Sequence, residues 1–171
     1  ENVTGGTGDD TFAVQAGASV VSMNGAGGSD TVTVDVDNQT LTHDVTAPAS
    51  GTISVTGAAT ITYASVETRT FSNVPAGSAT VNIAGGDGAI DSTDDYTVQR
   101  VGSDLQVVVD GNILTTSPSS TIADLVITGT ADDDTLTIDL AGQSFNDVIP
   151  AGDITFDGGA GFDALIVSGT P

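Results

Sequence analysis

Aspartate recurs at a fixed place in four glycine-containing segments of this chain. The segments are GGTGDDTFA (residues 5–13), GAGGSDTVT (25–33), GTADDDTLT (129–137) and GGAGFDALI (158–166). Their sixth position is occupied by Asp10, Asp30, Asp134 and Asp163, and their eighth by Phe12, Val32, Leu136 and Leu165. Short carboxylates beside flexible glycines suit a hard cation such as Ca²⁺, which binds through oxygen atoms.

Such loops could bind calcium in pairs. Glycine lets the backbone curl, so that carbonyl oxygens point inward and the sixth-position carboxylate joins them. Because Ca²⁺ takes six to eight oxygens, one turn cannot supply them all, and two turns stacked on successive coils would share an ion. Asp10 and Asp30 lie 20 residues apart, and Asp134 and Asp163 lie 29 apart. Either separation suits one coil.

The candidate calcium ligands include residues that flank the sixth position. In the four segments and next to them they are Asp9, Asp10, Asn24, Asp30, Asp132, Asp133, Asp134, Asp157 and Asp163. A fifth acidic segment, GGDGAIDSTDD (85–95), has a different spacing and adds Asp87 and Asp91. The alternative is that these segments are ordinary tight turns with solvated aspartates.

The residues between these segments predict short strands. Apolar and polar residues alternate at 31–37, 52–56, 60–63, 79–83, 96–101, 105–110, 113–116, 125–128, 135–140, 154–157 and 164–167. Period-two alternation is typical of half-buried strands, and the chain is therefore expected to be all-β. The repeated Gly/Asp segments favour a β-solenoid, similar to a parallel β-helix. A β-sandwich is the alternative, because Asp110-Gly111 favours a hairpin turn.

The length of 171 residues suits a single module, 1–171. A glycine turn, a strand and a second glycine turn occur in residues 3–36 and again in 127–167, which also suggests two related halves, about 1–90 and 91–171.

Composition excludes several classes of function. The chain has 23 acidic residues, only two Arg and no Lys, and its net charge is −21, so it lacks the cations that nucleic-acid binding requires. It has no long apolar run that would insert into a membrane. It also has no cysteine, so an extracellular protein of this kind would need a stabilising element other than disulfides, such as a metal.

The chain resembles a known family at the level of its repeats. The segments GGTGDDTF, ITYASVET, GTADDDTLTID and FDGGAGFDALIVSG resemble the repeat units of large secreted bacterial adhesin-like proteins with haemolysin-type, GGxGxDxUx calcium-binding repeats. The resemblance implies export, calcium-assisted folding outside the cell, and a role in adhesion, surface layers or extracellular fibres. The four copies are isolated and irregularly spaced, whereas the family's nonapeptides run in tandem.

The expected function is that of a calcium-stabilised structural or adhesive module of a secreted or cell-surface protein. Its expected partners are further copies or neighbouring repeats of the same protein, and cell-surface or matrix components. One alternative is a subunit of an extracellular filament or surface layer that assembles by strand pairing. Another is an acidic, salt-adapted domain that binds no specific ion.

A polysaccharide-active β-helix enzyme is the least favoured alternative. With so many aspartates, paired carboxylates occur by chance and indicate little. His43, the only histidine, is expected on the surface of a strand or loop. Arg69 and Arg100 are expected to be ion-pair partners. We therefore expect no catalysis.

Overall fold

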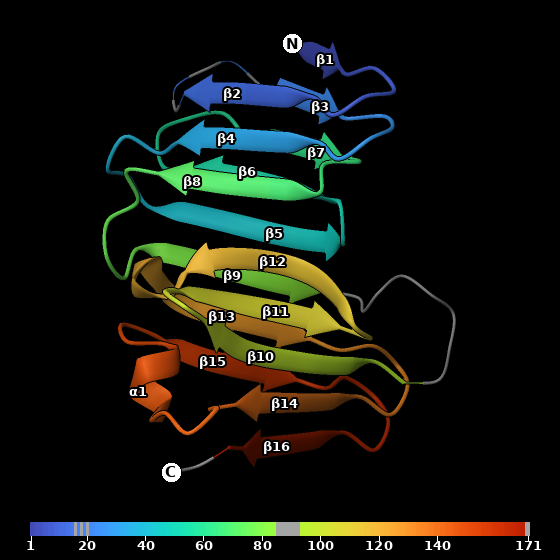
Figure 1. Cartoon of the computed structure of the whole chain (residues 1–171), viewed down its shortest axis with the longest axis vertical. Coiled ribbons are helices and arrows are strands. Elements are labelled where there is room, and N and C mark those ends of the chain that lie inside the picture. Colours follow the sequence, from blue (N-terminus) through green and yellow to red (C-terminus); the bar gives the residue numbers. More distant parts are fainter. Residues whose placement is uncertain (16, 18, 20, 85–92, 170–171) are drawn as a thin grey trace.

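The computed structural model describes residues 1–15, 17, 19, 21–84 and 93–169. Its strands lie across the long axis of the molecule in two layers, with the N-terminus at one end of the stack and the C-terminus at the other (Figure 1). The first layer is one eight-stranded sheet. In spatial order it contains β1 (Asn2–Thr4), β3 (Val21–Asn24), β7 (Ile61–Ala64), β6 (Ser50–Val55), β5 (Leu41–Ala47), β9 (Ala79–Ala84), β13 (Ile122–Thr128) and β15 (Asp153–Asp157).

The second layer consists of two smaller sheets. One contains, in spatial order, β2 (Thr11–Gln15), β4 (Thr31–Asp35) and β8 (Thr68–Ser72), and the other contains β12 (Asn112–Pro118), β11 (Asp104–Val109), β10 (Asp95–Val101), β14 (Thr135–Asp139) and β16 (Ala164–Ser168). The helical segments are a 3₁₀ turn at Ser119–Thr121 and α1 (Phe145–Val148). The all-β prediction is confirmed. No helix in the described part of the chain is long and apolar enough to cross a membrane.

Both parallel and antiparallel pairs occur. The strands that flank the Gly/Asp turns pair in parallel: β1 with β3, β2 with β4, β13 with β15 and β14 with β16. Antiparallel pairing joins β5, β6 and β7, and also β10, β11 and β12. Asp110 and Gly111, which connect β11 to β12, have φ angles of 48° and 80°. Two positive φ angles are what a type I′ hairpin turn requires, so the predicted Asp-Gly hairpin is present.

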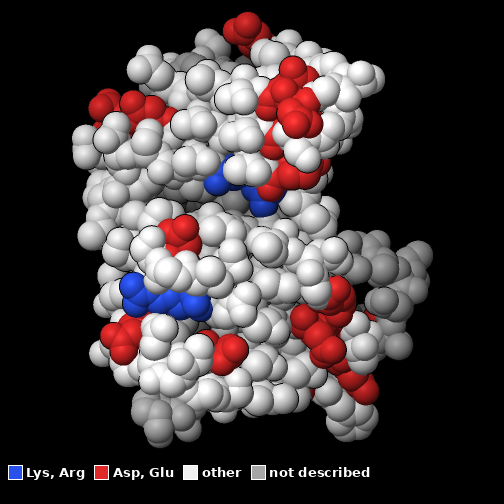
Figure 2. Space-filling view, viewed as in Figure 1, with Lys and Arg blue, Asp and Glu red and all other residues white. Residues whose placement is uncertain are grey.

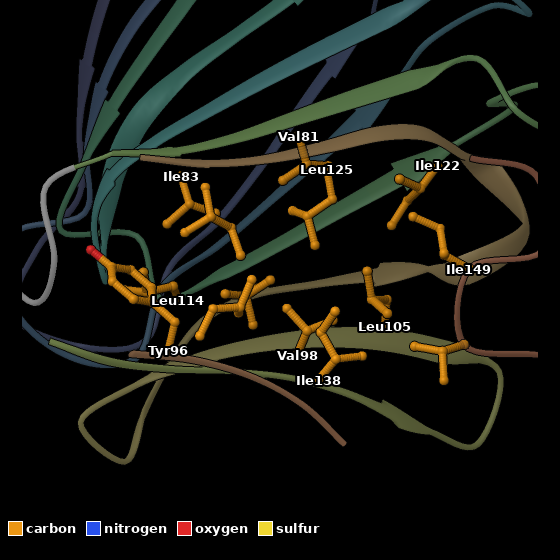
Figure 3. Close-up of a cluster of buried hydrophobic side chains, with 14 of the residues drawn as sticks. Val81, Ile83, Tyr96, Val98, Leu105, Leu114, Ile122, Leu125, Ile138 and Ile149 are labelled. Carbon is orange, nitrogen blue, oxygen red and sulfur yellow. The ribbon is translucent and has the colours of Figure 1, made fainter. Parts of the chain in front are cut away.

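Alternating side chains fill the space between the layers. On β4, Val32 and Val34 are fully buried while their neighbours are partly exposed. Figure 3 shows the same arrangement nearer the C-terminus, where Val81 and Leu125 of the first layer point toward Val98 and Ile138 of the second. The buried apolar residues form two clusters, one in each half of the stack. They meet near the seam between β8 and β12, which are edge strands of different sheets.

Every run of alternating residues predicted to be a strand is one, within a few residues at each end. The sequence analysis missed β1, β2, β3, β5 and β8.

Candidate functional site

The four Gly/Asp segments are the turns that carry the chain from the first layer to the second. The first turn (residues 5–10) connects β1 to β2, and the second (25–30) connects β3 to β4. The third (129–134) connects β13 to β14, and the fourth (158–163) connects β15 to β16. Because the flanking strands pair in parallel and in register, the first turn stacks on the second and the third on the fourth. Acidic side chains gather along the side of the molecule where the turns lie (Figure 2).

The first glycine of each turn makes room for the sixth-position carboxylate. A Cβ atom at Gly129 would lie 2.3 Å from Asp134 Oδ2, and one at Gly25 would lie 2.2 Å from Asp30 Oδ2. The same close approach occurs at the other two turns. Glycine at the first position and Asp at the sixth are therefore parts of one contact, in which the carboxylate folds back over the glycine Cα.

The sixth-position carboxylates bridge stacked turns. Asp30 Oδ1 accepts a hydrogen bond of 2.8 Å from the backbone N–H of Asp10. Asp163 Oδ1 likewise accepts one of 3.0 Å from the N–H of Asp134. In each pair the later turn supplies the carboxylate and the earlier turn supplies the amide. The structure thus brings Asp10 beside Asp30 and Asp134 beside Asp163, through hydrogen bonds between stacked turns.

The same kind of carboxylate–amide hydrogen bond also involves two residues outside the four turns, Glu67 and Asp94, which were not predicted to be calcium ligands. Glu67 Oε2 accepts the N–H of Asp30 at 2.7 Å, and Asp134 Oδ1 accepts the N–H of Asp94 at 3.0 Å. Glu67 lies in a shorter turn between β7 and β8, where its additional methylene lengthens the reach of the carboxylate. One signal could have identified both residues: an acid just before a strand of the second layer.

A second set of bridges runs in the opposite direction. The fifth-position Asp9 accepts the N–H of Ser29 through Oδ1 at 2.8 Å. Asp133 accepts the N–H of Phe162 through Oδ1, also at 2.8 Å. Here the earlier turn supplies the carboxylate. Each stacked pair of turns is therefore joined by two reciprocal carboxylate–amide hydrogen bonds, which we call the carboxylate ladder. Its bonds are charge-assisted and stronger than neutral ones.

The two turns of a stacked pair differ in conformation. In the first and third turns the sixth-position Oδ2 accepts the N–H of the second residue, as between Asp134 and Thr130 at 2.6 Å. In the second and fourth turns the residue before the first glycine takes that N–H instead: Asn24 accepts from Ala26 and Asp157 from Gly159. These second residues have φ angles of 75° at Ala26 and 88° at Gly159. Gly6 and Thr130 have no such positive φ, which explains why the third turn tolerates threonine there.

In the second turn this conformation leaves a buried carboxylate oxygen without a hydrogen-bond donor. Asn24 takes the N–H of Ala26, and Asp30 Oδ2 is left with no hydrogen-bond partner although the residue is only 1% exposed. The other carboxylate oxygen of Asp30 is used by Asp10.

The described residues fit a bound calcium ion poorly. Three or more acids or histidines do not converge on a common point anywhere in the described ranges. Most of the turn carboxylates that were expected to be ligands accept backbone N–H groups.

The sequence-predicted ligands fall into four groups. Carboxylate-to-amide bonds between turns use Asp9, Asp10, Asp30, Asp133, Asp134 and Asp163 as donors or acceptors. Asn24 and Asp157 cap amides within their own turns, whereas Asp132 is exposed at the tip of the third turn. Asp87 and Asp91 lie outside the described residues.

A buried polar cluster lies near the seam. His43 is fully buried, and its Nε2 lies 2.8 Å from the hydroxyl of Tyr63. The Arg69 guanidinium lies 5.6 Å from the centre of the Tyr63 ring. The expectation of a surface histidine is therefore wrong. The side chain at position 43 points from β5 into the core, where an imidazole with one hydrogen bond can replace an apolar side chain.

Burial controls the ionisation of this cluster. It lowers the pKa of His43 to about 3, helped by the positive charge of Arg69, so that the imidazole is neutral at pH 7. Burial also raises the pKa of Tyr63 to about 12. Neutral side chains enclosed in a core have no access to a substrate, so this cluster provides no argument for catalysis.

The two arginines bind carbonyl oxygens. Arg69 donates to the carbonyls of Pro48, Val66, Glu67 and Leu114. Arg100 donates to the carbonyls of Gly102 and Asp147. Within the described residues both arginines donate to backbone carbonyls, and the expected ion pairs are not found there. Comparison with protein-family models, curated proteins and solved structures found no match to this chain.

Proposed function

We propose that this chain is a structural module, a two-sided β-solenoid that serves as a stiff segment of a secreted or cell-surface protein. The observation that carries the proposal is the carboxylate ladder, which occurs in both halves of the chain with the same donors, acceptors and direction. It places the acids of the repeated turns in contacts that hold successive turns together.

The solenoid part rests on the strand order. Each Gly/Asp turn crosses from one layer to the other, and within each stacked pair the strands of the first turn pair in parallel with those of the second. The hairpins β5–β6 and β11–β12 lengthen the two layers at the same level of the stack. In this view they are insertions into a coil and do not form a separate sandwich.

Calcium is the second part of the proposal. The ladder places acids above one another in a chain whose net charge is −21, with only two arginines to offset it. Divalent cations near such a column reduce the repulsion, and they stabilise the folded state in proportion to their preference for it. Folding would then be favoured by the millimolar calcium found outside cells.

The test is a thermal melt followed by circular dichroism, in chelator and then in millimolar calcium at constant ionic strength. The proposal expects a rise in Tm with calcium that sodium at the same ionic strength does not reproduce, and that magnesium, the other divalent cation, reproduces at least in part. Asp30→Ala and Asp163→Ala should lower the Tm in chelator, because each removes a carboxylate that accepts an amide of the stacked turn. The exposed Asp132→Ala is the matched control.

The two parts of the proposal fail separately. An unchanged melt in calcium would remove the ion and leave the structural module. A wild-type Tm in both variants in chelator would show that the ladder does not hold the turns together, and the structural proposal would be lost.

A further inference from the structure

The two ends of the stack are open. At the N-terminal end, β1 and β2 are edge strands, and a cavity of about 530 Å³ lies between them, lined in part by Val3, Phe12 and Val14. At the C-terminal end, β15 and β16 are edge strands, and a cavity of about 330 Å³ is lined in part by Phe156 and Leu165. Both ends thus expose unpaired strand edges and the end of the apolar core.

The end turns are the two that match the repeat motif in full, GGTGDDTFA and GGAGFDALI. Each lacks one neighbour in the ladder. Asp10 Oδ1 has no partner in the described part of the chain, where the first turn stacks on another turn on one side only. The backbone N–H of Asp163 likewise has no described partner, since among the described residues the fourth turn stacks only on the third. One end therefore has a free carboxylate oxygen where the other has a free amide.

We propose that the C-terminal edge of this chain binds the N-terminal edge of a second copy, head to tail. The inference rests on the solenoid arrangement proposed above. In the expected contact, the fourth turn of one copy stacks on the first turn of the next copy. The fourth turn then has the role of the earlier turn in an internal stacked pair, and the first turn has the role of the later one. The junction continues the contact that already joins turns within the chain.

The register follows from the internal pairs. In both stacked pairs the sixth-position residues align, and the strands after them pair residue for residue, as Thr11 with Thr31 and Thr135 with Ala164. The same rule aligns Asp163 with Asp10, so that the N–H of Asp163 donates to Asp10 Oδ1. It also directs the N–H of Thr11 to the carbonyl of Asp163, as the N–H of Ala164 is directed to that of Asp134.

The apolar side chains agree with this register. Leu165 and Val167 of β16 are 59% and 50% exposed, although their partners on β14 face the core. The junction places them beside Phe12 and Val14, which are only partly buried on β2. Covering these side chains removes apolar surface from water, which favours association. Unpaired strand edges are themselves templates for pairing with another chain.

The negative charge of the chain opposes this contact and makes its strength depend on salt concentration. Two copies each carry a net charge of −21, so they repel at low ionic strength. Phe162 stands at the fifth position of the fourth turn, where Asp9 and Asp133 stand in the earlier turns of the internal pairs, so the junction forms the sixth-position bond but lacks the second bond of the ladder. We expect association to strengthen with salt, because salt screens the repulsion.

Single-cysteine variants test the geometry directly, because the chain has no cysteine of its own. Ala13→Cys and Ile166→Cys would be mixed under mild oxidation in chelator. Both positions face outward, Ile166 is 46% exposed, and the proposed register pairs them across the junction. Neighbouring strands bring paired Cα atoms within disulfide range. We expect the mixed dimer of the two variants to predominate over either homodimer.

Two controls make the result decisive. The double variant Ala13→Cys, Thr33→Cys places cysteines on an internal pair of β2 and β4, and should form a disulfide within one molecule. Mixing Thr33→Cys with Ile166→Cys should give no excess of the mixed dimer, because Thr33 lies one turn inside the stack. If the internal disulfide forms but the mixed dimer of Ala13→Cys and Ile166→Cys does not, head-to-tail binding is refuted while the solenoid survives. If the internal disulfide also fails, the solenoid itself is refuted.

Sedimentation over a wide range of protein concentration supplies an independent measurement. Wild type should associate more strongly as salt rises. Leu165→Asp should weaken association roughly tenfold or more, because it would bury an unpaired charge. Ile166→Asp, on the outward side of the same strand, should have a much smaller effect. A wild-type chain that remains monomeric at every concentration and salt level overturns the proposal.

Discussion

The carboxylate of Asp30 accepts a hydrogen bond of 2.8 Å from the backbone N–H of Asp10, 20 residues earlier in the chain. The equivalent bond from Asp134 to Asp163 spans 29 residues. The carboxylate of one turn thus bonds to the backbone of the turn stacked on it, although the two turns are far apart in the sequence. This relationship gives the aspartates of the repeated segments a structural role without a metal ion.

The ladder should be most sensitive at Asp134, which is fully buried and accepts the amides of Asp94 and Thr130. Asp134→Ala removes the carboxylate that both amides donate to and should lower the free energy of unfolding by about 2–4 kcal/mol. Asp134→Asn keeps one acceptor oxygen and should cost less. Urea unfolding followed by circular dichroism measures both.

The asparagine variant also separates hydrogen bonding from charge. If repulsion along the acidic column outweighed the bonds, Asp134→Asn would be more stable than wild type, and that result would contradict the ladder. Asp132→Ala, in the same turn but exposed, is the matched control and should change stability by less than about 0.5 kcal/mol.

Ala26 is predicted to be a site of removable strain. Its φ of 75° is unfavourable for a residue with a Cβ atom, and Gly159 occupies the equivalent position with a φ of 88°. Ala26→Gly should raise the free energy of unfolding by up to about 1 kcal/mol. The reciprocal Gly159→Ala should lower it by more, because the new Cβ would also lie 2.1 Å from the carbonyl oxygen of Thr130. Thermal melts of the two variants should shift in opposite directions, and a shift in the same direction would contradict the assignment.

The sequence predicted much of the fold because local patterns decide it. Alternation in segments such as 31–37 predicted strands, and the shared sixth-position aspartates predicted which turns stack. The missed strands depart from that pattern. On β8 the buried inward position holds Arg69, and on β5 it holds His43, so apolar alternation is interrupted. Only tertiary contacts make these polar residues acceptable in the core.

The sequence predicted most residues of the candidate site, but it did not predict the hydrogen bonds that these residues make. Composition shows that the turns are acidic, but it does not distinguish an aspartate directed at an ion from one directed at an amide. Stacking decides this, because it brings the N–H of one turn within reach of the carboxylate of the next. Glu67 was missed for a related reason: its turn is shorter and does not match the repeat, although the carboxylate reaches the same place.

His43 should make the protein less stable in mild acid. The unfolded state takes up a proton below a pKa of 6.5, whereas the folded state resists it until about pH 3. The folded state therefore binds fewer protons, and the free energy of unfolding should fall as pH drops below 6.5, by up to about 1.4 kcal/mol per pH unit. Between pH 6.5 and 5 this amounts to about 2 kcal/mol, before most carboxylates titrate.

The matched variant for this measurement is His43→Gln. It retains a polar side chain near Tyr63 but has no group that titrates in this range, so its unfolding free energy should be nearly constant from pH 6.5 to 5. Urea unfolding at several pH values compares the two slopes. Equal slopes in both proteins would assign the acid sensitivity to other groups.

Arg69 should hold the two halves of the stack together at the seam. It is 8% exposed and donates to carbonyls in the β5–β6 turn, the β7–β8 turn and β12, so a single guanidinium bonds segments on both sides. Burial lowers its pKa, but an arginine remains charged at neutral pH.

Arg69→Met keeps an apolar stem, leaves these carbonyls without a donor, and should lower the free energy of unfolding by about 3–5 kcal/mol. Arg69→Lys should cost less, because one ammonium has fewer donors and reaches only some of the carbonyls. Arg100→Met is the control, since Arg100 binds two carbonyls at a more exposed site, and it should cost about 1 kcal/mol or less. Urea unfolding of the three variants gives the order, and an Arg69→Met protein as stable as Arg100→Met would show that the seam is held by the apolar clusters alone.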